Sequence, residues 1–238
     1  TLYTGAISYI NNRGSELYYW DINSNPNDLT HAASVNVNSS DGSGSHGYAQ
    51  YLIEYDGSIF YRATPNGASD YELYEYNLTA DSLQEHEIGS TGSHDGLHYA
   101  SMIVFQDKLY MIGEDDVAST GKELFVFDRS GAPELVMDIN SGSGNGFNNA
   151  NNPSTGAVGK WWDPTIFNDK LYFIANDGTG SDLWVYDGIS EPTKAYDFNT
   201  SSIQHLTSLT VLDDALFFLG DSGGAGATTG TIDLWSIG

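Results

Sequence analysis

Four basic side chains occupy matching places in successive segments of the chain, nine or ten residues before an aspartate that recurs in a turn. They are His46, His98, Lys160 and His205. Aromatic residues accompany them: Tyr48, Tyr99, Trp161 and Trp162. Imidazole gains charge near neutral pH, and aromatic faces pack on sugar rings. The set therefore predicts a site for an acidic glycan or another small anion; the alternative is that these side chains only plug a central channel.

A second group of polar residues has the spacing of a cation-binding loop. In "DINSNPND", oxygen-bearing side chains alternate at Asp21, Asn23, Asn25 and Asn27. Calcium prefers such oxygen ligands, but the stretch lacks the central glycine and the distant bidentate glutamate of a calcium loop. An Asn-rich turn explains the same residues. Calcium is thus the only cofactor that the sequence suggests, and no motif requires one.

The sequence contains no pair of metal-binding histidines and no phosphate loop. Most acidic residues recur at turn positions, where aspartate accepts backbone hydrogen bonds. The acids of "GEDDVAST", residues 113–120, are explained as a solvated turn. We therefore expect no catalytic residue and no enzyme, with a glycoside-active enzyme that uses paired carboxylates as an alternative.

Short stretches of sequence that recur along the chain predict the strands that hold these residues in place. An acidic residue, a leucine and an aromatic residue recur at intervals of 51 to 59 residues, starting at Glu16, Glu72, Glu123, Asp182 and Asp233. A second phrase runs in step with it: an apolar strand, a tight turn with Asp and an aromatic strand, as in "FNDKLYF" at 167–173. Such a pair predicts a β-hairpin, and a period near 50 residues in an all-β chain is typical of propeller blades.

The predicted fold is an all-β, single five-bladed β-propeller of four-stranded antiparallel blades that spans residues 1–238. The approximate repeats are 1–47, 48–98, 99–160, 161–205 and 206–238. The first blade lacks its innermost strand and the last blade its outer strand. Open edges invite pairing. We expect completion by strands from both termini or self-association by strand donation; a longer repeat array is the alternative.

The repeated phrases resemble those of the bacterial ELWxxDGT-repeat proteins, also called hyalin-like. The best copy is Asp182-Leu183-Trp184 with Asp187-Gly188. Tyrosine or phenylalanine replaces the tryptophan in three repeats, and most repeats lose the Gly-Thr end. The resemblance implies a propeller-like, exported and often cell-surface protein, with no established catalytic residues.

The composition of the chain limits the classes of partner that it can bind. The 238 residues carry a formal net charge of −24 and no cluster of Lys or Arg, which argues against nucleic acid; no apolar run is long enough for membrane insertion. We expect an extracellular or cell-surface, non-enzymatic binding or adhesion module whose partner is a glycan or surface polysaccharide. The alternatives are a structural subunit of an extracellular filament or surface layer and the glycoside-active enzyme.

Overall fold

The computed structural model describes residues 2–8, 14–20, 30–33, 47–64, 71–89, 96–98, 102–115, 118–147, 164–197, 206–221 and 232–238. Every regular element in these ranges is a β-strand, which confirms the all-β prediction. The strands form five antiparallel sheets that follow one another in chain order.

The second and fourth sheets are four-stranded meanders, as predicted, and the third sheet has five strands. The second sheet runs β4 (Gln50–Tyr55), β5 (Ser58–Ala63), β6 (Glu72–Asn77) and β7 (Ser82–His86). The fourth runs β13 (Thr165–Phe167), β14 (Lys170–Asn176), β15 (Ser181–Tyr186) and β16 (Thr193–Tyr196). In the third, two short strands share the innermost place: β8 (Gly96–Leu97), β9 (Ile103–Phe105), β10 (Lys108–Glu114), β11 (Lys122–Phe127) and β12 (Glu134–Met137).

The first and last sheets have three strands each in the described residues. The first contains β1 (Leu2–Ser8), β2 (Gly14–Trp20) and β3 (Thr30–Ala33). The last contains β17 (Thr207–Leu212), β18 (Ala215–Asp221) and β19 (Ile232–Ile237). Through the register, β1 corresponds to β5, β10, β14 and β18, the second strands of the other sheets.

Two-residue turns set the hairpin register in the middle sheets. Asp56 and Gly57, between β4 and β5, have φ of 46° and 74°. Asn168 and Asp169, between β13 and β14, have φ of 48° and 54°. Two successive positive φ angles are the signature of the type I′ turn, whose twist matches that of the flanking strands. The Asp-containing phrase therefore encodes the hairpins, as predicted.

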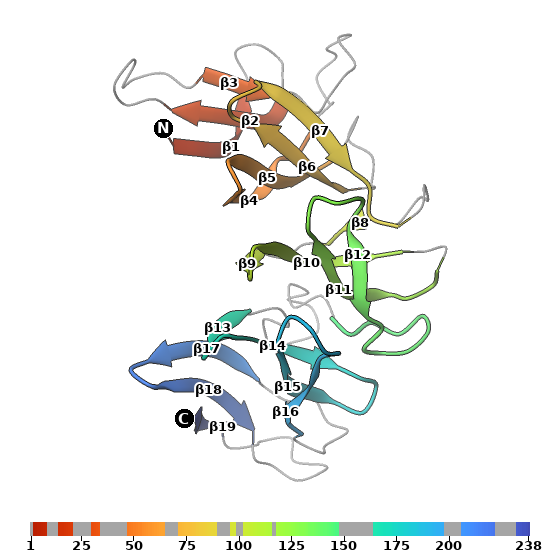
Figure 1. Cartoon of the computed structure of the whole chain (residues 1–238), viewed down its shortest axis with the longest axis vertical. Coiled ribbons are helices and arrows are strands. Elements are labelled where there is room, and N and C mark those ends of the chain that lie inside the picture. Colours follow the sequence, from red (N-terminus) through yellow and green to blue (C-terminus); the bar gives the residue numbers. More distant parts are fainter. Residues whose placement is uncertain are drawn as a thin grey trace.

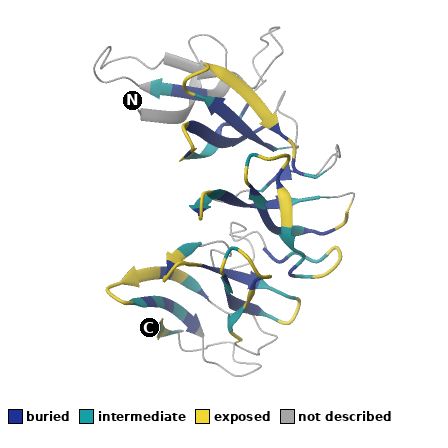
Figure 2. Ribbon diagram, viewed as in Figure 1, coloured by how far each residue is buried: buried dark blue, intermediate teal, exposed yellow. Residues whose placement is uncertain are grey.

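The core lies between neighbouring sheets. The leucine of each of the first four phrases is fully buried, at Leu17, Leu73, Leu124 and Leu183. Each belongs to a cluster with apolar residues from the second strand of the following sheet; Leu183, for example, shares one with Leu216 and Phe218. Figure 2 shows the middle strands buried and much of β7 and β17 exposed. Both faces of a sheet are therefore covered wherever it has two neighbours.

The sheets follow an arc in Figure 1, with β1–β3 at one end and β17–β19 at the other. The N and C ends lie on the same open side of this arc. Successive antiparallel meanders that pack face to face around a common centre fit a β-propeller.

Trp184 tests the packing between the third and fourth sheets. It is 5% exposed, lies in a cluster with Tyr110 and Phe147, and donates from Nε1 to the Ala175 carbonyl at 3.2 Å. We expect Trp184→Ala to lower the free energy of unfolding by about 3 kcal/mol, because it empties a large core site. Urea denaturation measures the loss. Trp235→Ala is the matched control, since this partly exposed tryptophan occupies the same place in the last sheet, and its loss should be smaller. Equal losses would contradict this account of the core.

Candidate functional site

Most of the predicted binding set lies outside the described residues. These are His46, Tyr99, Lys160, Trp161, Trp162 and His205, together with the proposed calcium ligands Asp21, Asn23, Asn25 and Asn27. Only Tyr48 and His98 are described, and both are half-buried. Within the described ranges, no three His, Cys, Asp or Glu residues gather as a metal ion would require. The ring of basic residues therefore stays a prediction.

His98 corrects one part of that prediction. Burial, with the nearby charges of Lys122 and Arg62, lowers the pKa of His98 to about 3. An unperturbed imidazole would gain charge near neutral pH. His98 is therefore neutral at physiological pH and supplies no charge for an anion. The nearby Arg62 side chain makes contacts within the protein. Its Nε donates to the Leu97 carbonyl at 2.7 Å, and its guanidinium group lies over the Tyr71 ring.

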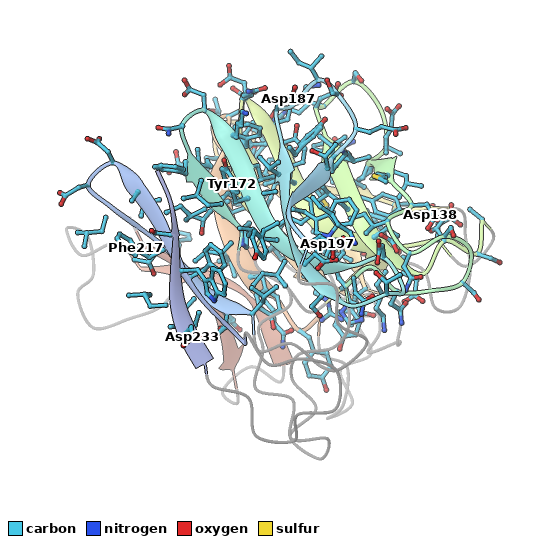
Figure 3. All side chains as sticks on the ribbon, turned by 90° about the horizontal axis from the view of Figure 1, so that it is seen from below. Asp138, Tyr172, Asp187, Asp197, Phe217 and Asp233 are labelled. Atoms are coloured by element: carbon cyan, nitrogen blue, oxygen red, sulfur yellow. The ribbon has the colours of Figure 1, made fainter. Side chains whose placement is uncertain are left out.

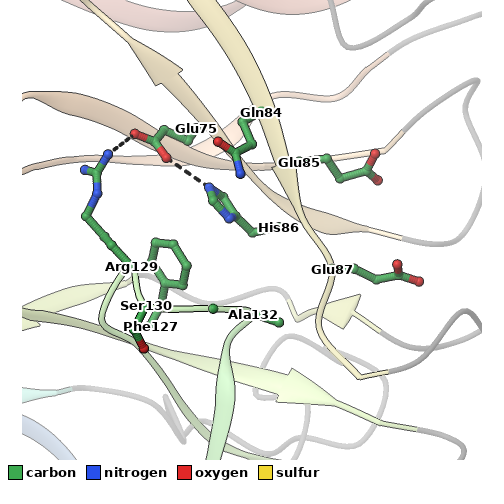
Figure 4. Close-up of a pocket in the computed structure, with 10 residues that line it drawn as sticks. Glu75, Gln84, Glu85, His86, Glu87, Phe127, Arg129, Ser130 and Ala132 are labelled. Carbon is green, nitrogen blue, oxygen red and sulfur yellow. Dashed lines mark hydrogen bonds and ion pairs between the residues drawn. The ribbon is translucent and has the colours of Figure 1, made fainter.

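A different group of polar residues surrounds a cavity of about 420 Å³ between the second and third sheets (Figure 4). Strands β6 and β7 form one wall, and the end of β11 with the turn after it forms the other. The lining residues are Glu75, Gln84, Glu85, His86, Glu87, Phe127, Arg129, Ser130, Gly131 and Ala132. We call this cavity the Glu75 pocket.

Glu75 is a buried carboxylate held by three partners. Ser58 Oγ donates to its Oε1 at 2.6 Å, and Arg129 Nη2 donates to the same oxygen at 2.5 Å. His86 Nε2 lies 2.9 Å from the other oxygen, Oε2. Burial acts to raise the pKa of Glu75, but the hydrogen bonds from Ser58 and His86 and the charge of Arg129 outweigh it and lower the pKa. Glu75 is therefore ionised at neutral pH.

The ionised carboxylate fixes the tautomer of His86. A carboxylate only accepts hydrogen bonds, so Nε2 of His86 must carry the hydrogen. In the neutral ring Nδ1 is then the acceptor, and in the described part of the chain no residue donates to it. Figure 4 shows the His86 ring between Glu75 and the loop of Ser130. A carboxylate–imidazole pair beside a cavity is an arrangement that can take up and release a proton.

Glu75, His86 and Arg129 all differ from the residues at the matching positions of the other repeats. The places of Glu75 in other sheets are held by Tyr19, Val126, Val185 and Ser236. The place of His86, opposite the phrase leucine, is held elsewhere by Ala33, Met137 and Tyr196. The sequence does contain a signal for this site, because Glu75 is a charged residue at a sheet position that is mostly apolar in the other repeats. A comparison limited to the acids that recur in every repeat therefore does not reveal it.

Arg129 departs from the repeat in its backbone as well as its side chain. It follows Phe127-Asp128, where the fourth repeat has Tyr186-Asp187 and then Gly188. Gly188 has φ of 85°, and Arg129 keeps a positive φ of 67°. This conformation favours glycine and disfavours a long side chain. Arginine is thus held in an unfavourable backbone conformation at the place where it reaches across to Glu75 of the neighbouring sheet.

The acids of the repeated phrase have a different, structural role. Glu72 accepts from the Ile88 amide at 2.8 Å, and Glu123 accepts from the amides of Ile139, Asn140 and Gly146. These acceptors satisfy backbone groups of their own sheet's loop, as expected from the sequence. Asp182 instead lies 2.7 Å from Lys194 Nζ. None of these acids lines the Glu75 pocket.

Neither family models nor curated proteins match the chain. No helix in the described ranges is long and apolar enough to cross a membrane. Solved structures resemble the chain at low sequence identity.

A prolyl endopeptidase structure matches 98% of this chain with a TM-score of 0.54 and 10% identity. The chain spans 32% of that protein's length. The β-propeller domain of a trilobed protease from Pyrococcus furiosus matches 98% of the chain and 76% of its own length, at 9% identity and a TM-score of 0.36. A family 117 glycoside hydrolase from Zobellia galactanivorans matches 86% of the chain and 65% of its own length, at 12% identity and a TM-score of 0.37.

These comparisons contradict the prediction of a non-enzymatic binding or adhesion module, and with it the prediction that the chain is no enzyme. The structure that matches with a TM-score of 0.54 is that of an enzyme, a prolyl endopeptidase. An identity of 10% shows a shared fold alone, so the reaction has to be inferred from the residues of this chain.

Proposed function

We propose that this chain is a five-bladed propeller that hydrolyses glycosidic bonds, with the Glu75 pocket as its active site. The observation that carries the proposal is the Glu75–His86 pair, because both residues line a cavity large enough for a sugar ring. Glycosidases place a base and an acid on either side of the bond that they cleave.

The roles follow from the geometry. Nδ1 of His86 accepts a proton from a water molecule whose oxygen attacks the anomeric carbon as the bond to the leaving oxygen breaks. Glu75 holds the ring in the required tautomer and stabilises the imidazolium that forms. Glu87, one of the two carboxyl groups on the lining besides Glu75, is the proton donor to the leaving sugar oxygen. Gln84 and Ser130 offer amide and hydroxyl groups to sugar hydroxyls, and the ring of Phe127 forms an apolar part of the wall.

The charge distribution favours a neutral sugar. The cationic side chain of the pocket, Arg129, is paired with Glu75 and lies 3.6 Å from an Asp56 oxygen. Glu85 adds negative charge to the lining, and the chain as a whole has a formal charge of −24. A uronic acid or sulfated sugar would therefore be repelled.

A substrate panel tests this function. The purified chain is incubated with nitrophenyl glycosides of neutral sugars, nitrophenyl glucuronide and peptidyl nitroanilides, and release of the chromophore is followed. We expect turnover of one or more neutral glycosides and none of the glucuronide. Turnover of peptides alone, or of no compound by a chain shown to be folded, would overturn the proposal.

A further inference from the structure

The last sheet has an exposed apolar face at the place where every earlier sheet is covered. The phrase leucine of this sheet, Leu234, is 68% exposed, although its four counterparts are fully buried. Leu219 pairs with Leu234 across the sheet and is only partly buried, as is Phe217 on the same strand and face. Their counterparts in the third sheet, Ile112 and Tyr110, are 2% and 1% exposed. Figure 3 shows Phe217 on the last sheet, at one side of the molecule.

The four buried interfaces of the chain show what fits such a face. In each, the cover is the second strand of the next sheet, with an aliphatic residue, a bulky residue and a small residue at alternate positions. These triplets are Ile59, Tyr61 and Ala63; Leu109, Met111 and Gly113; Leu171, Phe173 and Ala175; Leu216, Phe218 and Gly220. The cover is therefore a sheet of this same repeat.

The first sheet has a strand of this kind. Strand β1 pairs with β2 in the register of the other second strands, so its corresponding positions are Leu2, Thr4 and Ala6. They keep the aliphatic and small ends of the pattern.

We infer that the exposed face around Leu234 binds the first sheet of a second copy of this chain. The first sheet of the same chain does not cover this face, because Leu234 is exposed in a structure that contains both sheets. Figure 1 places the two sheets at opposite ends of the arc. The contact would repeat the packing that the chain already uses between its own sheets, and burial of apolar surface would drive it.

Cross-linking tests the contact directly, because the chain contains no cysteine. Thr4→Cys and Leu234→Cys are prepared as single variants, mixed, and treated with a short bismaleimide. We expect a product of two-chain mass in the mixture and little in either variant alone. Ser82→Cys, on the exposed part of β7, replaces Thr4→Cys as the control and should give no product with Leu234→Cys.

Sedimentation equilibrium supplies a second readout that does not depend on the linker. Leu234→Glu should dissociate the wild-type assembly into monomers, whereas Ile189→Glu, at a side chain that is 89% exposed, should leave it intact. A wild-type chain that stays monomeric would overturn the inference. So would a double Thr4→Cys, Leu234→Cys variant that links only within one chain, because that result would show closure of the ring on itself.

Discussion

Replacement of His86 with asparagine should lower kcat/KM for the best neutral glycoside at least 100-fold. The variant removes the group that takes the proton from water, and general base catalysis is commonly worth about 10²- to 10⁴-fold. Glu75 keeps two of its three partners, Ser58 and Arg129, so the pocket should stay folded. Steady-state kinetics measure the loss, and urea unfolding shows whether stability has changed.

His98→Asn is the matched control for this variant. It makes the same substitution at a histidine that lies beside Arg62 and Lys122 and does not line the Glu75 pocket. Its kcat/KM should stay within about threefold of the wild type, a change of less than 1 kcal/mol in the activation barrier. If His86→Asn kept wild-type activity, or if both variants lost it equally, the Glu75–His86 pair would not be the catalytic base.

Glu123→Ala should lower the free energy of unfolding by about 5 kcal/mol. The Glu123 side chain is fully buried and accepts from three backbone amides, at 3.0, 3.3 and 2.7 Å. Alanine leaves these amides without an acceptor, and each buried unsatisfied donor costs about 1–3 kcal/mol. Urea denaturation at pH 7 provides the measurement. Glu134→Ala, on the exposed part of β12 in the same sheet, should change stability by less than about 0.5 kcal/mol.

The same residue predicts a pH dependence. Burial raises the pKa of Glu123 to about 7, although the amides of Ile139, Gly146 and Asn140 lower it. Between its ordinary value of 4.5 and about 7, the folded chain holds a proton that the unfolded chain has released. The contribution of Glu123 to stability should therefore fall as pH rises through this window and be fully present below it. The stability difference between wild type and Glu123→Gln should change over this range; a constant difference would contradict the raised pKa.

The fold was predictable to the level of strands because the repeat constrains it locally. Apolar residues such as Leu73 and Leu183 recur at one place, and Asp56-Gly57 marks a turn that only a hairpin accommodates. The arc of the sheets and the exposure of Leu234 were not predictable, since they depend on whether a neighbouring sheet is present to cover a face. Sequence periodicity predicts each sheet but does not say how the ends of the array meet.

The candidate site was missed because its members are far apart in sequence and unremarkable singly. Glu75 and Arg129 lie in different sheets, and only packing brings their side chains together. The predicted charge state of His98 was wrong for a related reason: burial, rather than the acidic composition of the chain, dominates its pKa. The remaining members of the predicted ring, and the resemblance to the ELWxxDGT repeats, stay predictions.

Nuclear magnetic resonance of the six imidazole side chains tests most directly whether substrate meets His86 in the Glu75 pocket. Long-range proton–nitrogen spectra are recorded while xylo-, cello- or malto-oligosaccharide is added, and the His86 signals are assigned as those absent from His86→Asn. We predict a saturable shift of the Nδ1 signal of His86 with the oligosaccharide whose glycoside is hydrolysed, and no comparable shift at His98. Shifts confined to other imidazoles, or no shift with any of these sugars, would contradict the account.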